Sequence, residues 1–190
     1  NQTVNQLTGG VQYLLNANKV NILKGKGRLI SNSSILVTKD DGSTEEVVAK
    51  NIIIATGSKE IEIHGFPIDG RNVINSTHAL ALSELPKKLA IIGGGVIGVE
   101  FASIFRRMGA EVSIVELSPS LIPNEDEETR EALKWSLEEN GIRIYTNCVA
   151  QSYEKCGIDG GMSLKIEQKD GSHVKIECDK ISVCVGRKAS

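Results

Sequence analysis

The sequence lacks the features that mark several large classes of protein. Its longest apolar runs, at residues 51–55 and 89–92, have the length of strands. None approaches the roughly 18 apolar residues that a membrane-spanning helix needs. Basic residues are not in surplus either, since the formal net charge is −2. We therefore expect no membrane and no nucleic acid among its partners.

The two ends lack the marks of natural termini. The first residues, NQTVNQLTGG, have neither the basic start nor the apolar core of a signal peptide. They contain no initiating methionine and begin inside a predicted helix, whereas the last residues, GRKAS, follow a predicted strand. We interpret the chain as an internal fragment of a longer protein. We expect a cytoplasmic location, with the mitochondrial matrix as the alternative, because a transit peptide would have been lost with the N-terminus.

Cysteine is scarce and forms no paired pattern. The 4 cysteines contain no CxxC and no Cys-x4-Cys spacing. Cys178 and Cys184 lie in apolar strand patterns, which indicates buried thiols. With 40% hydrophobic residues the chain can bury a packed core, so we expect no disulfide framework.

Two stretches of the chain, residues 36–59 and 164–188, share one pattern. Each has a strand, an Asp-Gly turn, a second strand, a charged residue and an apolar strand that ends in glycine. Asp-Gly pairs suit tight hairpins because glycine accepts positive φ angles. The copies are 129 residues apart, a spacing that indicates two related domains in tandem.

Between these copies, strands and helices alternate. Apolar patterns predict strands at residues 88–92, 111–115 and 142–145, with helices between them. Such an alternation is typical of a parallel sheet with right-handed crossovers. The hairpin at residues 162–178 adds an antiparallel layer. We place a linker at residues 59–85, which hold prolines and glycines and show little periodicity.

The two helices have recognisable ends. The first is predicted over residues 96–108, with Gly109 as its stop and with one apolar stripe formed by Ile97, Phe101, Ile104 and Met108. The second begins with acidic residues after Asn124, the expected N-cap, and ends at Gly141.

A GxGxxG motif follows the first of these strands and opens the first helix. Gly93 permits the tight turn, Gly95 lets the backbone approach a pyrophosphate, and Gly98 lets helix and strand pack closely. The free N–H groups of the helix N-terminus would face the phosphates. The alternative is a glycine-rich turn without a ligand. Glu100, in the first turns of the same helix, is also explained by the helix dipole alone.

Glu116 ends the next strand, 18 residues after Gly98. A carboxylate there can accept both hydroxyls of an adenosine ribose and would repel a 2′-phosphate. The following LSPSLIP contains no lysine or arginine that could hold such a phosphate. The sequence therefore favours NAD over NADP, against the alternative of a solvated glutamate at a strand end.

Several motifs occur together, in one order, over nearly all of the chain. They are LTGGVQYLL, NKVNILKGKGRL, NIIIATGS, INSTHAL, ELPKKL and GGGVIGVE. The chain resembles the pyridine nucleotide–disulfide oxidoreductases, and LTGG together with STHAL is similar to the lipoamide branch of that family. The resemblance implies a three-layer ββα FAD/NAD(P)-binding fold of the Rossmann type, with a parallel sheet and an antiparallel β-meander. It divides the chain into residues 1–70, the C-terminal part of an FAD-binding domain and a linker, and residues 71–190, an NAD-binding domain.

The resemblance also implies roles for individual residues. Contacts with FAD are implied for Gly27, Thr56, Gly57 and Ser58. Contacts with NAD are implied for Gly93, Gly94, Gly95, Val96, Ile97, Gly98, Val99, Glu100, Glu116, Val149 and Gly186. Among these, Glu116 would hold the adenosine ribose, Val149 would line the adenine pocket and Gly186 would border the nicotinamide. Glu100 would pair with a lysine beside the flavin N5.

Other parts of the family pattern are missing from these residues. We find no FAD-binding GxGxxG ahead of the first strand, no Cys-x4-Cys helix and no His–Glu base of a dimerisation domain. We therefore expect no catalytic residue and no metal site here. We interpret the 3 histidines as structural or exposed: His64, His78 and His173.

The implied parent enzyme oxidises protein-bound dihydrolipoamide through a redox disulfide and FAD and passes hydride to NAD. Its implied partners are the lipoyl-bearing acyltransferase of a 2-oxoacid dehydrogenase complex and a second copy of itself in a homodimer. We expect this stretch alone to bind NADH weakly and to be inactive. The alternatives are another flavoprotein reductase, such as a glutathione or mercuric reductase relative, and a non-catalytic NAD-binding module.

Overall fold

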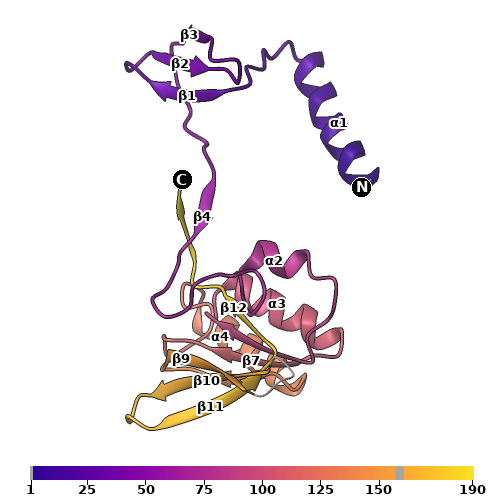
Figure 1. The fold of residues 1–190 in the computed structure, drawn as a ribbon, viewed down its shortest axis with the longest axis vertical. Coiled ribbons are helices and arrows are strands. Elements are labelled where there is room, and N and C mark those ends of the chain that lie inside the picture. Colours follow the sequence, from indigo (N-terminus) through magenta and orange to yellow (C-terminus); the bar gives the residue numbers. More distant parts are fainter. Residues whose placement is uncertain (1, 157–160) are drawn as a thin grey trace. The chain divides into compact units, whose positions relative to one another are not determined.

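The computed structural model describes residues 2–156 and 161–190. The chain divides into two compact units, Asn1–Ala55 and Thr56–Ser190 (Figure 1). Among the described residues, no helix has the length and apolar character needed to cross a membrane.

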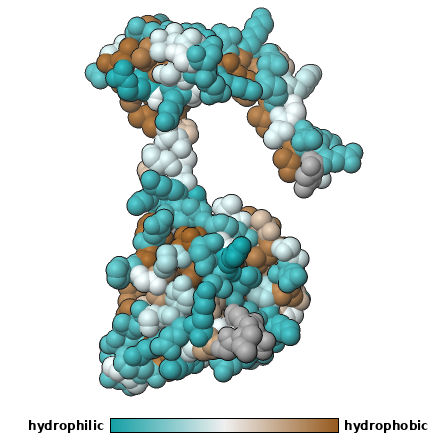
Figure 2. All heavy atoms as spheres, viewed as in Figure 1, coloured by the Kyte–Doolittle hydropathy of each residue, from teal (hydrophilic) through white to brown (hydrophobic). Residues whose placement is uncertain are grey.

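The first unit contains one helix and one small antiparallel sheet. Its elements are α1 (Gln2–Ala17), β1 (Lys26–Leu29), β2 (Ser34–Thr38) and β3 (Thr44–Val48). The predicted Asp-Gly turn joins β2 to β3, where Gly42 has a φ of 82° and Asp41 Oδ1 accepts the Ser43 N–H at 2.9 Å. No residue of α1 is buried. Its apolar side chains recur at helical spacing and are exposed (Figure 2): Val4, Leu7, Val11 and Leu14.

The apolar strand predicted at residues 51–55 is wrong. These residues form no strand, and Ile53 and Ile54 are 90% and 68% exposed. The equivalent segment of the second copy, β12 (Lys180–Val183), is a strand because it lies between two parallel neighbours. No such neighbour pairs with residues 51–55 in the part of the chain that the structure describes. A strand needs partners for its backbone N–H and C=O groups, and an apolar pattern alone does not supply them.

The second unit is built on a five-stranded parallel sheet with the order β5-β12-β6-β7-β8. The strands other than β12 are β5 (Val73–Ile74), β6 (Lys88–Ile92), β7 (Glu111–Val115) and β8 (Arg143–Tyr145). This confirms the three predicted strands, with the last starting one residue late. It also shows that the predicted linker contributes β5 and a short helix, α2 (Ser76–Leu80).

The two faces of this sheet pack against different layers. Alternate side chains of a strand point to opposite faces, and in β6 Leu89 and Ile91 join one core cluster while Ala90 and Ile92 join the other. The helices α3 (Val96–Arg107) and α4 (Glu127–Glu139) cover the first face (Figure 1). The antiparallel meander covers the second, with strands β9 (Cys148–Cys156), β10 (Gly161–Gln168) and β11 (His173–Cys178). The expected three-layer ββα arrangement is confirmed.

The apolar stripe predicted for α3 is wrong in part. Phe101 is buried, but Ile104 and Met108 are 49% and 59% exposed. The face that packs on the sheet carries small residues and phenylalanines instead: Gly98, Val99, Phe101, Ala102 and Phe105. Small residues let the helix axis approach the sheet closely, a choice that a hydrophobicity pattern does not detect.

The start of α4 also differs from the prediction. The N-cap is Asp126 rather than Asn124, because its Oδ1 accepts the Thr129 N–H at 2.9 Å and its Oδ2 accepts the Thr129 hydroxyl at 2.9 Å. Asp126 directly precedes the first helical residue, so its carboxylate reaches a free N–H of the first turn, whereas Asn124 lies two residues earlier. The predicted stops at Gly109 and Gly141 are confirmed, with φ angles of 104° and 78°.

Cys178 and Cys184 are buried, as predicted, Cys148 is buried as well, and the four cysteines are free thiols. Burial raises the pKa of Cys178 to about 12, and it also raises the pKa of Cys184 and Cys148. Cys156 is exposed. Three of the four thiols therefore lie in the fold as apolar groups.

Thiol labelling should reveal this difference. With a disulfide reagent at pH 8 we expect Cys156 to react at the rate of an exposed thiol. The other three should react at least about 100-fold more slowly, because they are buried and their raised pKa leaves little thiolate. Cys156→Ser is the control and should abolish the fast phase. Two or more fast thiols in the unchanged chain would contradict the buried assignment.

Candidate functional site

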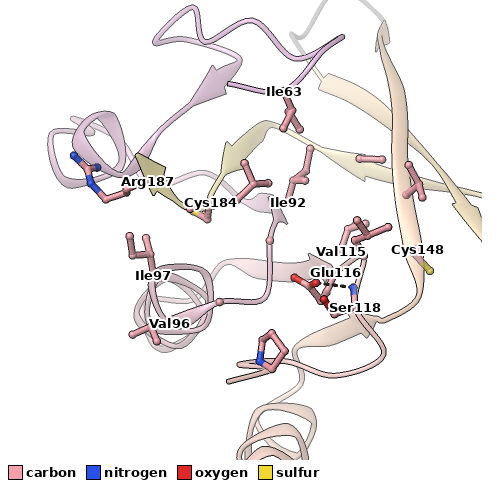
Figure 3. Close-up of a pocket in the computed structure, with 18 of the residues that line it drawn as sticks. Ile63, Ile92, Val96, Ile97, Val115, Glu116, Ser118, Cys148, Cys184 and Arg187 are labelled. Carbon is pink, nitrogen blue, oxygen red and sulfur yellow. Dashed lines mark hydrogen bonds between the residues drawn. The ribbon is translucent and has the colours of Figure 1, made fainter. Parts of the chain in front are cut away.

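The second unit has a cleft of about 640 Å³ beyond the carboxyl ends of β6, β7 and β12. Ligands of open α/β sheets bind at this edge, where the chain leaves one strand for elements on different faces. The wall is mostly apolar (Figure 3), and its residues come from the loops after these strands, from α3, from β9 and from residues 63–64. The lining residues are Ile63, His64, Ile92, Gly93, Gly95, Val96, Ile97, Val115, Glu116, Leu117, Ser118, Pro123, Asn124, Cys148, Val149, Ala150, Cys184, Val185, Gly186 and Arg187.

The glycine-rich loop after β6 is shaped by close backbone approaches. Gly93 has a φ of 109°, and a Cβ on it would stand against the carbonyl group of Cys184. A Cβ on Gly98 would stand against the carbonyl oxygen of Gly93. These two glycines therefore let the loop turn and let α3 approach β6, as their positions in the motif predict.

Gly95 differs from these two glycines because the space around it is open. A Cβ at this position would meet no atom within 4 Å, and the residue lines the cleft. Gly95 is also the N-cap of α3, without a side-chain cap, and the first turn holds no acidic residue. The uncapped N–H groups and the helix dipole favour an anion beside Gly95.

Glu116 lies just beyond β7 and is 9% exposed. Its Oε2 accepts the Gly94 N–H at 2.6 Å and its Oε1 accepts the Ser118 N–H at 2.6 Å, the second of which is drawn in Figure 3. These bonds hold the carboxylate beside the glycine loop. A carboxylate has about four acceptor sites, so two remain for the hydroxyls of a ribose.

The structure brings several of the predicted nucleotide residues together at this cleft and places others behind it. The cleft is lined by Gly93, Gly95, Val96, Ile97, Glu116, Val149 and Gly186. Gly94, Gly98 and Val99 are buried. Glu100 is exposed and lines a second cleft, of about 310 Å³, between α3 and α4. Its predicted pairing with a lysine stays a prediction.

None of the residues predicted to touch FAD is among the residues that line this cleft. Gly27 belongs to β1 of the first unit, and a Cβ on it would be 3.4 Å from Ile35 Cγ2. Thr56, Gly57 and Ser58 belong to the second unit and lead into β4 (Ser58–Glu60). β4 pairs antiparallel with β13 (Arg187–Ala189). Gly57 has a φ of 79° and open space around its α-carbon, which fits a close approach by a ligand.

Sequence reasoning missed lining residues that come from distant segments. Ile63 and His64 lie in the predicted linker, and nothing in their local pattern connects them with the glycine loop. Arg187 follows Gly186 directly, so its place at a strand end could have indicated it. Of the histidines, His64 and His173 are exposed, whereas His78 is half-buried and belongs to the capping box at the start of α2.

Comparison with protein families gives one match that covers nearly the whole chain. The model of the family described as pyridine nucleotide-disulphide oxidoreductase matches residues 2–190. Two dihydrolipoyl dehydrogenases are close relatives. The one from Trypanosoma brucei brucei is 38% identical over 98% of this chain and 39% of its own length, and the one from Staphylococcus aureus is 42% identical over 97% and 38%. A leghemoglobin reductase from Vigna unguiculata is 38% identical over 98% of this chain and 35% of its own length.

Solved structures of two such proteins are also similar to this chain. LpdA from Mycobacterium tuberculosis is similar with a TM-score of 0.82 at 26% identity, over 98% of this chain and 40% of that one. The flavoprotein disulfide reductase RclA from Escherichia coli is similar with a TM-score of 0.70 at 26% identity, over 100% and 43%. The chain therefore spans about two fifths of the length of the proteins it matches.

Proposed function

The chain belongs to the pyridine nucleotide-disulphide oxidoreductase family, and from this we propose that it supplies the NAD-binding half of a dihydrolipoyl dehydrogenase. The observation that carries the proposal is the open Gly95 at an uncapped helix N-terminus, beside a carboxylate held by two backbone N–H groups. The dihydrolipoyl dehydrogenases among its relatives, at 38% and 42% identity, support the choice within the family.

The residues around the cleft would hold four parts of a dinucleotide. Gly95 and the first turn of α3 would hold the pyrophosphate, and Glu116 would accept the hydroxyls of the adenosine ribose. The apolar wall near Val149 would bury the adenine, and Gly186, after β12, would border the nicotinamide. Gly94 and Gly98 would act indirectly, because they are buried and allow the close packing that fixes the shape of the glycine loop.

The chain's own part in the reaction is to bind and orient. FAD, when bound, would supply the redox chemistry between a dithiol and the nicotinamide. The loop after β6 would fix the position of the dinucleotide along the sheet edge, and the apolar walls would exclude water from the ring. Gly27, Thr56, Gly57 and Ser58 would hold part of the flavin, and Glu100 would pair with a lysine near it. In this proposal residues 1–70 belong to the FAD-binding domain and linker, and residues 71–190 form the NAD-binding domain.

The activity of the whole protein follows from the family branch and is part of the same proposal. It would oxidise dihydrolipoamide carried by the lipoyl-bearing acyltransferase of a 2-oxoacid dehydrogenase complex, work as a homodimer and act in the cytoplasm or the mitochondrial matrix. The 190 residues contain no Cys-x4-Cys pair. We therefore expect them to bind NADH without oxidising dihydrolipoamide.

Titration with NADH and NADPH tests the proposal. We expect calorimetry to detect NADH binding and to give an affinity for NADPH at least about tenfold lower, because the Glu116 carboxylate repels a 2′-phosphate. Glu116→Gln should weaken NADH binding about tenfold, which corresponds to the loss of roughly one charged hydrogen bond. The same variant should reduce the difference between the affinities for NADH and NADPH.

The matched control is Glu125→Gln, which removes the same charge from an exposed residue outside the cleft. It should bind both nucleotides like the unchanged chain. A chain that prefers NADPH would contradict the proposal and favour a different flavoprotein reductase. A chain that binds neither nucleotide would contradict it entirely.

A further inference from the structure

The two sides of the nucleotide cleft carry side chains of opposite charge. Strands β7 and β12 lie on opposite sides of β6, so the residues that follow them flank the glycine loop from both sides. Glu116 follows β7, and Arg187 lies beyond the end of β12. Figure 3 shows Arg187 well apart from Glu116 in the cleft. A dinucleotide with its adenosine ribose at Glu116 and its pyrophosphate at Gly95 would therefore place its nicotinamide on the Arg187 side.

The guanidinium of Arg187 is held in place by β4. Its Nε donates to Ser58 Oγ at 2.8 Å and its Nη2 donates to the Ser58 carbonyl at 2.6 Å. Its Nη1 lies 3.4 Å from Glu60 Oε1, and that oxygen also accepts the Thr77 hydroxyl at 3.4 Å. The two charged side chains are 35% and 24% exposed. Three contacts on three different nitrogens leave the positive charge little freedom to move.

The net charge at this end of the cleft depends on Arg187 and Glu60. Arg187 is the one permanent cation among the residues that line the cleft, and His64 is the other basic residue there. Glu60 compensates Arg187. A hydrogen bond from its own backbone N–H, followed by the charge of Arg187, holds the pKa of Glu60 below its ordinary value, against the opposing effect of burial. Glu60 is therefore ionised at neutral pH.

The two redox forms of the nucleotide differ in charge at one place. The nicotinamide ring is a pyridinium cation in NAD⁺ and is neutral in NADH, whereas the rest of the molecule is identical. A fixed charge near the ring changes the binding energy of NAD⁺ and leaves that of NADH nearly unchanged. We propose that the Glu60–Arg187 pair sets the relative affinity of the cleft for NAD⁺ and NADH. This inference rests on the proposed NAD-binding function.

The proposal predicts shifts of opposite sign for the two partners. Without the charge of Glu60, the uncompensated guanidinium repels the pyridinium, so NAD⁺ binds more weakly relative to NADH. Without the charge of Arg187, the carboxylate of Glu60 attracts the pyridinium, so NAD⁺ binds more tightly relative to NADH. A pair that only fastened β4 to β13 would give the same result whichever partner was removed.

The experiment measures the ratio of the dissociation constants for NAD⁺ and NADH by calorimetry on the 190-residue chain. We expect Glu60→Gln to raise this ratio about two- to fivefold and Arg187→Gln to lower it by a similar factor, the range for one charge acting across several ångströms of partly hydrated protein. The double variant should return near the original ratio. Glu62→Gln, two residues from Glu60, exposed and outside the cleft lining, is the matched control and should leave the ratio unchanged.

Binding of ADP-ribose distinguishes a failure of the proposed NAD-binding function from a failure of this inference alone. This ligand keeps the adenosine and the pyrophosphate but has no nicotinamide ring, so it reports whether the rest of the site is intact. If the unchanged chain bound neither NADH nor ADP-ribose, the proposed function and this inference would both fail. If it bound them, but the two single variants moved the ratio in the same direction or not at all, the inference alone would be overturned.

Discussion

Replacement of Gly95 with aspartate is expected to abolish NADH binding without unfolding the second unit. Gly95 has a φ of −73° and a ψ of −179°, which any residue can adopt, and a Cβ there meets no atom within 4 Å. Aspartate is also a favoured N-cap and would accept the free N–H groups of α3. It would occupy the anion position with a negative charge of its own. We expect the affinity for NADH to fall at least about 100-fold, because the phosphates lose these donors and meet a like charge.

Two measurements separate this effect from a general loss of structure. The unfolding temperature of Gly95→Asp should equal or exceed that of the unchanged chain. Gly95→Ala adds only a methyl group to open space and should reduce the affinity far less than aspartate does. Retention of normal NADH binding by Gly95→Asp would show that the phosphates lie elsewhere and would remove the main support for the proposed site.

Replacement of Gly98 with valine should have the opposite profile, a large loss of stability. A Cβ on Gly98 would stand against the carbonyl oxygen of Gly93, a backbone atom that cannot turn away as a side chain can. Relief of this overlap requires α3 to move from β6, which disturbs the packing of Phe101 and Phe105 on the sheet. We expect the free energy of unfolding to fall by about 3 kcal/mol in urea titration.

Gly95→Val is the matched control for this change. It introduces the same side chain three residues earlier, where the surrounding space is open, and should keep the free energy of unfolding within about 1 kcal/mol of the unchanged chain. Equal stability of the two valine variants would contradict the close approach of helix and strand. The pair thus divides the motif into one glycine that leaves room for a ligand and one that leaves room for the protein itself.

Much of the local structure could be predicted from the sequence because its causes are local. The stops at Gly109 and Gly141 and the hairpin turns at Gly42 and Gly171 depend on neighbouring residues only. Where two local solutions competed, the prediction was wrong. Asp126 caps α4 in place of Asn124, since only the structure shows which oxygen reaches the Thr129 N–H.

The sheet order was decided by contacts between distant segments. β12 has the same apolar pattern as residues 51–55, yet only β12 is a strand, because β5 and β6 satisfy its backbone groups on both sides. The position of β12 between β5 and β6 also brings Cys184, Gly186 and Arg187 to the edge of the sheet where the glycine loop leaves β6. Neither event depends on nearby sequence, so no local pattern could predict it.

The GxGxxG motif, its strand and helix, and the acid at the end of the next strand were determined by the sequence itself. Their spacing, together with the strand before the motif and the helix after it, indicates a dinucleotide and favours NAD. Only the tertiary structure decided which further residues complete the cleft: Ile63 and His64 in its wall, and Arg187, which is paired with Glu60. The physical reason is that a binding surface is formed by side chains that folding brings together, and their separation along the chain carries no record of that contact.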